Sequence, residues 1–351
     1  MRARFRRLES TLLPVSHGHM PYTAALASEA TGQMPTATRI VPDDLAGLRL
    51  DQALAKMFPD YSRSRLTAWL KAGAIRVDGG SPKPREKVAG GEEIVLDAEL
   101  EARDDTTAEP MPLDIAYEDD AVLIINKPAG LVVHPGAGNV SGTLMNGLLA
   151  HSAPLASLPR AGIVHRIDKL TTGLLLVAKT LEAHTALTRL LADHAIKRSY
   201  IAIVTGVLTG GGRIEAPIGR HPVDRTRMAV REPGKPAVTH YTVRERYAAH
   251  TAVDVKLETG RTHQIRVHFA YRRHPLVGDP VYGGRLALPA GASDTVREAL
   301  RGFRRQALHA LRLEFEHPVS GQAVIAEAPL PADLSELMAV LRDAARVSQG
   351  E

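Results

Sequence analysis

A short polar segment that leads into an apolar run carries the clearest chemical signal in this sequence. Residues 163–179 read Ile-Val-His-Arg-Ile-Asp-Lys-Leu-Thr-Thr-Gly-Leu-Leu-Leu-Val-Ala-Lys, and the run 174–178 has the length of a buried strand. A carboxylate such as Asp168, held beside a cation at the start of a strand, stays ionised and can act as a covalent nucleophile. Arg166 and Asp168 could equally form a structural ion pair at a turn, because such pairs also perturb carboxylates.

Three further stretches also place charged and polar residues at close spacing beside glycine, proline or apolar runs. They are residues 126–131 with 134–136, residues 198–202, and residues 260–268 with 274–280. Together with residues 163–179, and in this order, they resemble the signature of the RluA family of RNA pseudouridine synthases. The resemblance extends from about Leu48 to about Pro331.

The resemblance implies an enzyme that isomerises specific uridines to pseudouridine in large-subunit ribosomal RNA, with Asp168 as the nucleophile. Arg266 matches the arginine that pairs with this aspartate, and Tyr200 matches the tyrosine that stacks on the target base and takes part in removing the C5 proton. Arg166 matches the arginine that fills the space of the flipped-out nucleotide. His165 and Lys127 are expected to contact RNA beside it.

The carboxylates near Asp168 bear on the type of reaction. A retaining glycosidase uses two carboxylates, whereas isomerisation needs one, because uracil leaves as a stabilised anion. No second carboxylate stands near Asp168 in the sequence, which favours isomerisation. The histidines lack the spacing of a metal site, and the glycine-rich stretches match neither a phosphate loop nor a dinucleotide motif. We therefore expect no metal and no organic cofactor.

The composition is typical of a folded protein that binds a polyanion. The 351 residues are 44% hydrophobic, carry a formal net charge of +5 and include no cysteine, which excludes disulfides. No apolar run approaches the roughly 20 residues needed to span a bilayer. We expect a cytoplasmic monomer with no membrane partner.

The chain divides into four predicted parts. Residues 1–43 are an extension, rich in arginine at its start, that is disordered or begins at an upstream start codon; a transit peptide is the alternative. Residues 44–98 form a small α/β unit, residues 99–111 an acidic linker, and residues 112–346 the catalytic domain.

The pattern of two helices followed by a hairpin in residues 44–98 resembles the S4 RNA-binding domain, and we call this unit the S4-like arm. Such a domain presents cations to RNA phosphates, which supplies affinity without sequence choice. A solvated surface would explain the same charges. The predicted RNA-binding residues, here called the basic face, are Arg63, Arg65, Lys71, Arg85 and Lys87.

The remaining pattern predicts an α+β fold with a mixed, mostly antiparallel sheet, and the resemblance adds a cleft across its centre. Helices are expected near 145–150, 183–192 and 334–346. Strands are expected at 122–125, 174–178, 200–205, 239–243, 252–257 and 308–315.

Two alternatives to the ribosomal RNA modification remain open from the sequence. The same chemistry could act on transfer RNA or on another ribosomal site. The chain could also be a non-catalytic RNA-binding factor for ribosome assembly, although the presence of Asp168, Tyr200 and Arg266 argues against this. The RNA could be presented free or within a pre-ribosomal particle.

Overall fold

The computed structural model describes residues 36–58, 61, 63–98, 107–136, 138–224, 226–286 and 288–349. Most of the predicted extension and of the acidic linker lies outside the described residues, as does the side chain of Arg65. The described residues fall into two parts, 36–98 and 107–349.

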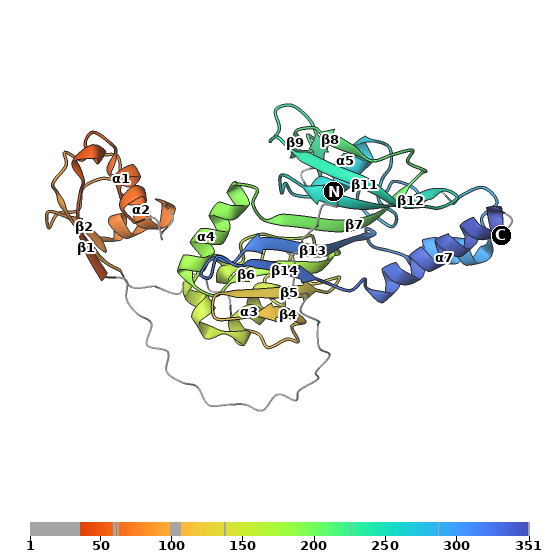
Figure 1. Ribbon diagram of the computed structural model, residues 1–351, viewed down its shortest axis with the longest axis horizontal. Helices are drawn as coiled ribbons and strands as arrows, with labels where there is room; N and C mark the ends of the chain where they lie inside the picture. The colour runs from red at the N-terminus through yellow and green to blue at the C-terminus, as the bar shows by residue number, and fades with distance from the viewer. Residues whose placement is uncertain are drawn as a thin grey trace, which may run out of the picture. The chain divides into compact units, whose positions relative to one another are not determined.

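The first part is a three-stranded antiparallel sheet with two helices (Figure 1). Its elements are β1 (Thr36–Ile40), α1 (Leu50–Met57), α2 (Arg63–Ala72), β2 (Ile75–Val77) and β3 (Glu93–Asp97), in the sheet order β1-β3-β2. β1 falls within residues 1–43, so this end of the predicted extension belongs to the S4-like arm. Its sequence, Thr-Ala-Thr-Arg-Ile, shows little alternation of apolar residues, and the strand is defined by pairing with β3.

The core of the S4-like arm forms where the helices cover one face of this sheet. Leu50 and Leu54 lie one turn apart on α1 and are buried, as is Leu70 on α2. Ile75 and Ile94 are buried on the facing strands. The spacing of apolar residues therefore accounts for both helices.

The second part is built on a nine-stranded sheet in which β13 carries an extra partner, β14 (Figure 1). Its order is β4-β5-β6-β13-β7-β12-β11-β8, and among the described strands only β6 and β13 pair in parallel. This confirms the predicted mixed, mostly antiparallel sheet. The strands are β4 (Ile115–Glu118), β5 (Val122–Lys127), β6 (Thr172–Ala178), β7 (Lys197–Thr205), β8 (Gly212–Glu215), β11 (Val238–Arg246), β12 (His250–Leu257), β13 (Leu308–Glu316) and β14 (Ala323–Glu327).

A two-stranded ribbon and five α-helices complete this part. The ribbon is β9 (Ile218–Arg220) with β10 (Met228–Val230), and the helices are α3 (Leu144–His151), α4 (Leu181–Ala192), α5 (Gln264–Tyr271), α6 (Asp294–Gly302) and α7 (Ala332–Gln349). Helices α3, α4 and α7 were predicted, whereas α5 and α6 were not. The eight residues of α5 mix charged and apolar types without a clear period. None of the helices in the described ranges is long and apolar enough to cross a membrane.

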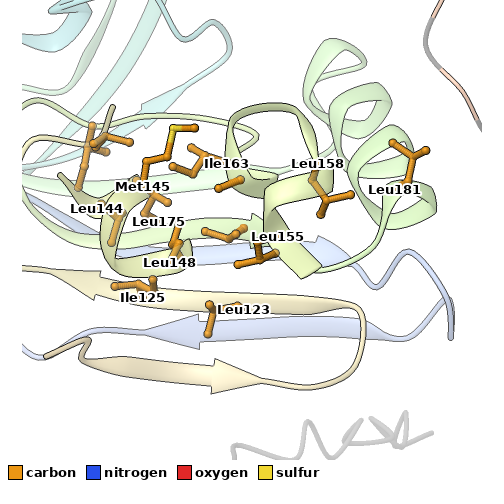
Figure 2. Packing of buried hydrophobic residues seen from close by; sticks show 14 of the residues in the cluster. Leu123, Ile125, Leu144, Met145, Leu148, Leu155, Leu158, Ile163, Leu175 and Leu181 are labelled. Atoms are coloured by element: carbon orange, nitrogen blue, oxygen red, sulfur yellow. The ribbon is translucent and has the colours of Figure 1, made fainter. Parts of the chain in front are cut away.

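The buried sides of β5 and β6 explain the uninterrupted apolar run that follows Asp168. Leu123 and Leu175 point into a cluster with Leu144 and Leu148 of α3 (Figure 2). Alternate residues, such as Leu176, face the opposite cluster that includes α4. All seven residues of β6 are buried. A strand that is buried on both sides needs apolar side chains that face in both directions, which explains the apolar run 174–178.

Gly173 lies at the parallel pairing of β6 with β13. Its φ is +106°, and a Cβ atom there would stand 2.2 Å from the carbonyl oxygen of Ala310 and 2.7 Å from its nitrogen. Both contacts involve backbone atoms, which cannot move without separating the strands. Glycine at this position is therefore required for the sheet that carries the Asp168 loop.

Replacing Gly173 with Ala should destabilise the protein by about 2–5 kcal/mol, because positive φ and steric overlap both oppose a side chain. Chemical denaturation of the purified variant would measure the effect. Gly302→Ala is the matched control, because open space surrounds its Cβ position and its φ is not positive. Equal unfolding midpoints for the two variants would contradict the required close approach.

Candidate active site

A cavity of about 500 Å³ brings together five of the residues predicted from the sequence. Asp168, Arg166 and His165 line it from the loop before β6, and Tyr200 lines it from β7. Arg266 reaches it from α5, although 98 residues separate it from Asp168 in the chain. The cavity thus joins motifs that the sequence could only place in order.

Hydrogen bonds to neighbouring segments hold the loop that carries Asp168. The Thr171 N–H donates to the Asp168 carbonyl at 3.0 Å, which closes a turn. The Thr171 hydroxyl accepts from the Gln306 amide at 2.9 Å, and the Thr172 hydroxyl lies 2.9 Å from Nδ1 of His309. The loop is therefore attached to β13 and the segment before it at two successive residues.

The Arg266 guanidinium connects Asp168 to a second carboxylate. Its Nη1 donates to Oδ2 of Asp168 at 3.0 Å, while Nε and Nη2 donate to the two oxygens of Asp279 at 2.7 and 2.8 Å. The Arg266 side chain is 4% exposed and the Asp168 side chain 17%. Arg266 thus contacts one oxygen of Asp168 from a fixed direction, because the bidentate pair with Asp279 orients its plane.

Electrostatics keep Arg266 and Asp279 charged. Burial alone would lower the pKa of Arg266, but its hydrogen bonds to Asp279 and the charge of Asp168 raise it above the usual value. Burial would raise the pKa of Asp279, yet the bond to Arg266 holds it below the usual value. The Asp279 carboxylate also accepts the backbone N–H groups of Val281 and Tyr282.

Tyr200 lies on β7, which sits between β13 and β12 in the sheet. Its backbone is opposite Ala310 on one side and Val255 on the other, and its side chain lines the cavity. Burial raises the pKa of the Tyr200 hydroxyl, while the Arg198 guanidinium opposes the shift. The phenol therefore stays protonated at neutral pH.

The structure places Lys127 away from the RNA contact predicted for it. Its side chain is 0% exposed, and its Nζ donates to the carbonyl oxygens of Pro128, Leu131 and Lys169 at 2.7, 3.0 and 3.0 Å. All three N–H donors of the ammonium are thus used inside the protein. Burial lowers the pKa of Lys127 to about 7, and the Asp168 carboxylate opposes the shift. Lys127 therefore stabilises the Asp168 loop from inside the protein, through its bond to the Lys169 carbonyl.

His165 and Arg166 are adjacent in sequence but differ in surroundings. Nε2 of His165 accepts the N–H of Leu176 at 3.0 Å, and burial lowers the pKa of His165 to about 3. His165 is therefore a neutral acceptor that bonds the loop to β6. Its other nitrogen, Nδ1, is buried without a hydrogen-bond partner among the described residues, so the structure does not present His165 for the RNA contact predicted for it. Arg166 is exposed at the cavity, where a nucleic acid can reach it.

The basic face of the S4-like arm is partly free and partly paired. Lys71, Arg85 and Lys87 are exposed. Arg63 instead donates to Oδ2 of Asp51 at 2.7 Å, so part of its charge is neutralised. The exposed cations remain candidates for phosphate contacts.

Two polar residues beside Asp168 were given no role by the sequence. Asp279 holds Arg266, and His263 places Nε2 3.8 Å from Oδ1 of Asp168 and Nδ1 2.7 Å from the Tyr282 hydroxyl. Both lie inside the quoted stretches 260–268 and 274–280, but their spacing shows no pairing partner. Among the described residues, no three His, Asp or Glu side chains are grouped as metal ligands would be.

Comparisons with known proteins agree with this geometry. Residues 121–271 match the family model described as RNA pseudouridylate synthase, and residues 48–94 match the S4 domain. The solved structure of human RNA Pseudouridylate Synthase Domain Containing 1 superposes with a TM-score of 0.51 at 27% identity, covering 66% of this chain and 90% of that one. Human RNA Pseudouridylate Synthase Domain Containing 4 shares the fold, with a TM-score of 0.52 at 24% identity over 65% of this chain and 92% of its own.

This chain is similar to curated bacterial proteins named ribosomal large subunit pseudouridine synthase D over nearly their whole length. Three examples show the extent of the similarity. The protein of Xanthomonas campestris pv. campestris is 55% identical over 88% of this chain and 94% of its own. The protein of Pseudomonas aeruginosa is 56% identical over 86% of this chain and 94% of its own. The protein of Escherichia coli (strain K12) is 53% identical over 87% of this chain and 94% of its own. With such similarity along both parts of the chain, this protein belongs to the RNA pseudouridylate synthase family and is an RNA pseudouridine synthase.

Proposed function

We propose that this enzyme converts specific uridines of large-subunit ribosomal RNA to pseudouridine, with Asp168 as the nucleophile. The observation that carries the mechanism is a carboxylate fixed by a buried arginine in a cavity that also contains a tyrosine. The choice of RNA is supported by the names of relatives that are 53–56% identical. An enzyme with this substrate would work in the cytoplasm, where bacterial ribosomes are assembled.

Asp168 has one oxygen available for bond formation. Arg266 occupies Oδ2, whereas Oδ1 has His263 at 3.8 Å, beyond hydrogen-bond length. In the proposed reaction an Asp168 oxygen bonds to C1′ of the ribose as the N1–C1′ bond breaks, and the electron pair remains on uracil. After the base turns, C5 bonds to C1′ and the aspartate leaves. The C5 proton is lost and N1 gains one, so the product is an isomer of the substrate.

Tyr200 and Arg166 have separate roles in this proposal. The ring of Tyr200 supports the base from the buried side of the cavity, and its hydroxyl assists removal of the C5 proton. Arg166, which is exposed, occupies the position of the flipped nucleotide in the RNA. This exchange leaves a nucleotide outside the helix, where Asp168 can reach its glycosidic carbon.

Replacing Asp168 with Asn should reduce pseudouridine formation by at least about 10⁴-fold, because the neutral amide cannot act as an anionic nucleophile. RNA affinity should stay close to that of the wild type. The test maps pseudouridine in ribosomal RNA from cells that lack the protein and are complemented with each variant. Asp294→Asn serves as the control, because that side chain is 90% exposed. Restoration of the same sites by Asp168→Asn would refute the nucleophile.

Replacing Tyr200 with Phe should keep the stacking surface and slow the chemical step by about 10²–10⁴-fold, the usual contribution of a proton-transfer group. Single-turnover assays at saturating RNA measure this step directly. Tyr271→Phe, at an exposed position, is the matched control. A wild-type rate for Tyr200→Phe would leave the tyrosine with stacking alone.

The basic face can be tested through the salt dependence of RNA binding. A triple change of Lys71, Arg85 and Lys87 to Gln should weaken binding and flatten the slope of log K against log[salt] by about 0.7–0.9 for each phosphate that is no longer neutralised. The control changes Arg297, Arg301 and Arg304 to Gln, which alters the net charge equally. Identical slopes for the two triple variants would show that only net charge matters.

A further inference from the structure

One of the three buried arginines among the described residues has no carboxylate partner. Arg266 pairs with Asp168 and Asp279, and Arg305 donates to both oxygens of Asp333 at 2.6 and 2.8 Å. Arg198 is 8% exposed, and its Nε has no acceptor within the described part of the chain. Burying an unpaired cation is costly, so a protein retains one where something else gains from it.

The position of Arg198 connects it to the reaction site. It lies on β7 two residues before Tyr200, so both side chains project from the same side of the strand. Both line the cavity that contains Asp168. The charge of Arg198 also reaches the neighbouring groups, because it opposes the rise in the pKa of Tyr200 and contributes to the low pKa of His165.

Gly260 leaves space for the guanidinium of Arg198. A Cβ atom on Gly260 would stand 2.7 Å from Nη1, which is closer than real Cβ atoms approach other atoms. Gly260 belongs to the same stretch as His263 and Arg266, and it also lines the cavity. The walls of the cleft therefore accommodate this cation beside the place where the base would bind.

We propose that Arg198 is a further substrate-binding residue, whose guanidinium receives an anionic oxygen of the target nucleotide. The inference rests on the proposed function and adds a residue to it. Two oxygens fit this chemistry: a uracil carbonyl oxygen, which gains charge as the N1–C1′ bond breaks, and a phosphate oxygen of the same nucleotide. Arg198 supplies donors and a positive charge to either and forms no bond that the reaction must break.

The first experiment compares Arg198→Met with the wild type in three measurements. The Tm should equal or exceed that of the wild type, because an unpaired buried charge is removed while the aliphatic stem is kept. If the ligand is uracil, the single-turnover rate at saturating RNA should fall by about 10²-fold, with affinity unchanged. If it is a phosphate, affinity should fall and the salt slope should flatten by about 0.7–0.9. Arg198→Lys should recover part of either effect, and Arg297→Met is the surface control.

Two results would overturn the proposal. One is a variant with unchanged rate, affinity and salt slope. The other is a lowered Tm with intact rate and affinity, which would mark Arg198 as a structural residue. Failure of the wild type to make pseudouridine in ribosomal RNA would instead refute the proposed function, and the RNA affinity and Tm of Arg198→Met would still decide the role of the arginine.

A double-mutant cycle tests the placement of the guanidinium. Gly260→Ala should displace the end of Arg198 without unfolding the protein, because the φ of Gly260 is not positive and the clashing atom ends a flexible side chain. Its reduction of rate or affinity should largely disappear in the Arg198→Met background. Fully additive effects would show that Gly260→Ala acts without Arg198 and would contradict the proposed arrangement.

Discussion

The arrangement of the cavity depends on the Arg266 guanidinium, which donates hydrogen bonds to both Asp168 and Asp279. Asp168, 98 residues away in the chain, and Asp279, 13 residues away, both bond to this one guanidinium, which is almost wholly buried. A buried ion pair repays the loss of hydration only when its geometry is good and its remaining donors and acceptors are satisfied. Here Asp279 uses two hydrogen bonds to orient Arg266, and the third holds Asp168. The carboxylate proposed as the nucleophile is thus positioned by a side chain that is itself held in place.

The sheet provides the rigid support that these hydrogen bonds between Arg266, Asp168 and Asp279 require. The loop of Asp168 precedes β6, a strand covered on both faces, and its following residues are bonded to the segment at β13. Gly173 allows the two strands to approach at their parallel pairing, where any side chain would meet the backbone of Ala310. The close pairing of β6 with β13 therefore limits how far Asp168 can move.

Among the described residues, the buried cations closest to Asp168 fall into two physical classes. Lys127 and Arg266 satisfy their donors within the protein, and each holds a part of the Asp168 loop or its carboxylate. Arg198 instead lines the cavity, and its Nε has no acceptor among the described residues. The first class contributes order to the free enzyme, whereas a cation of the second class gains its partner only when substrate enters. Stability and substrate binding are thereby assigned to different side chains.

The sequence alone predicted the family, the central strands, helices α3, α4 and α7, and five of the residues that line the cavity with or beside Asp168, because apolar periodicity and motif order are local properties. Which polar groups face each other became clear from the three-dimensional arrangement of the chain. It assigned β1 to the S4-like arm, buried Lys127 beneath the Asp168 loop, and joined Asp279 to Arg266. Such pairings depend on distances between segments far apart in the chain, and neither residue type nor spacing carries that information.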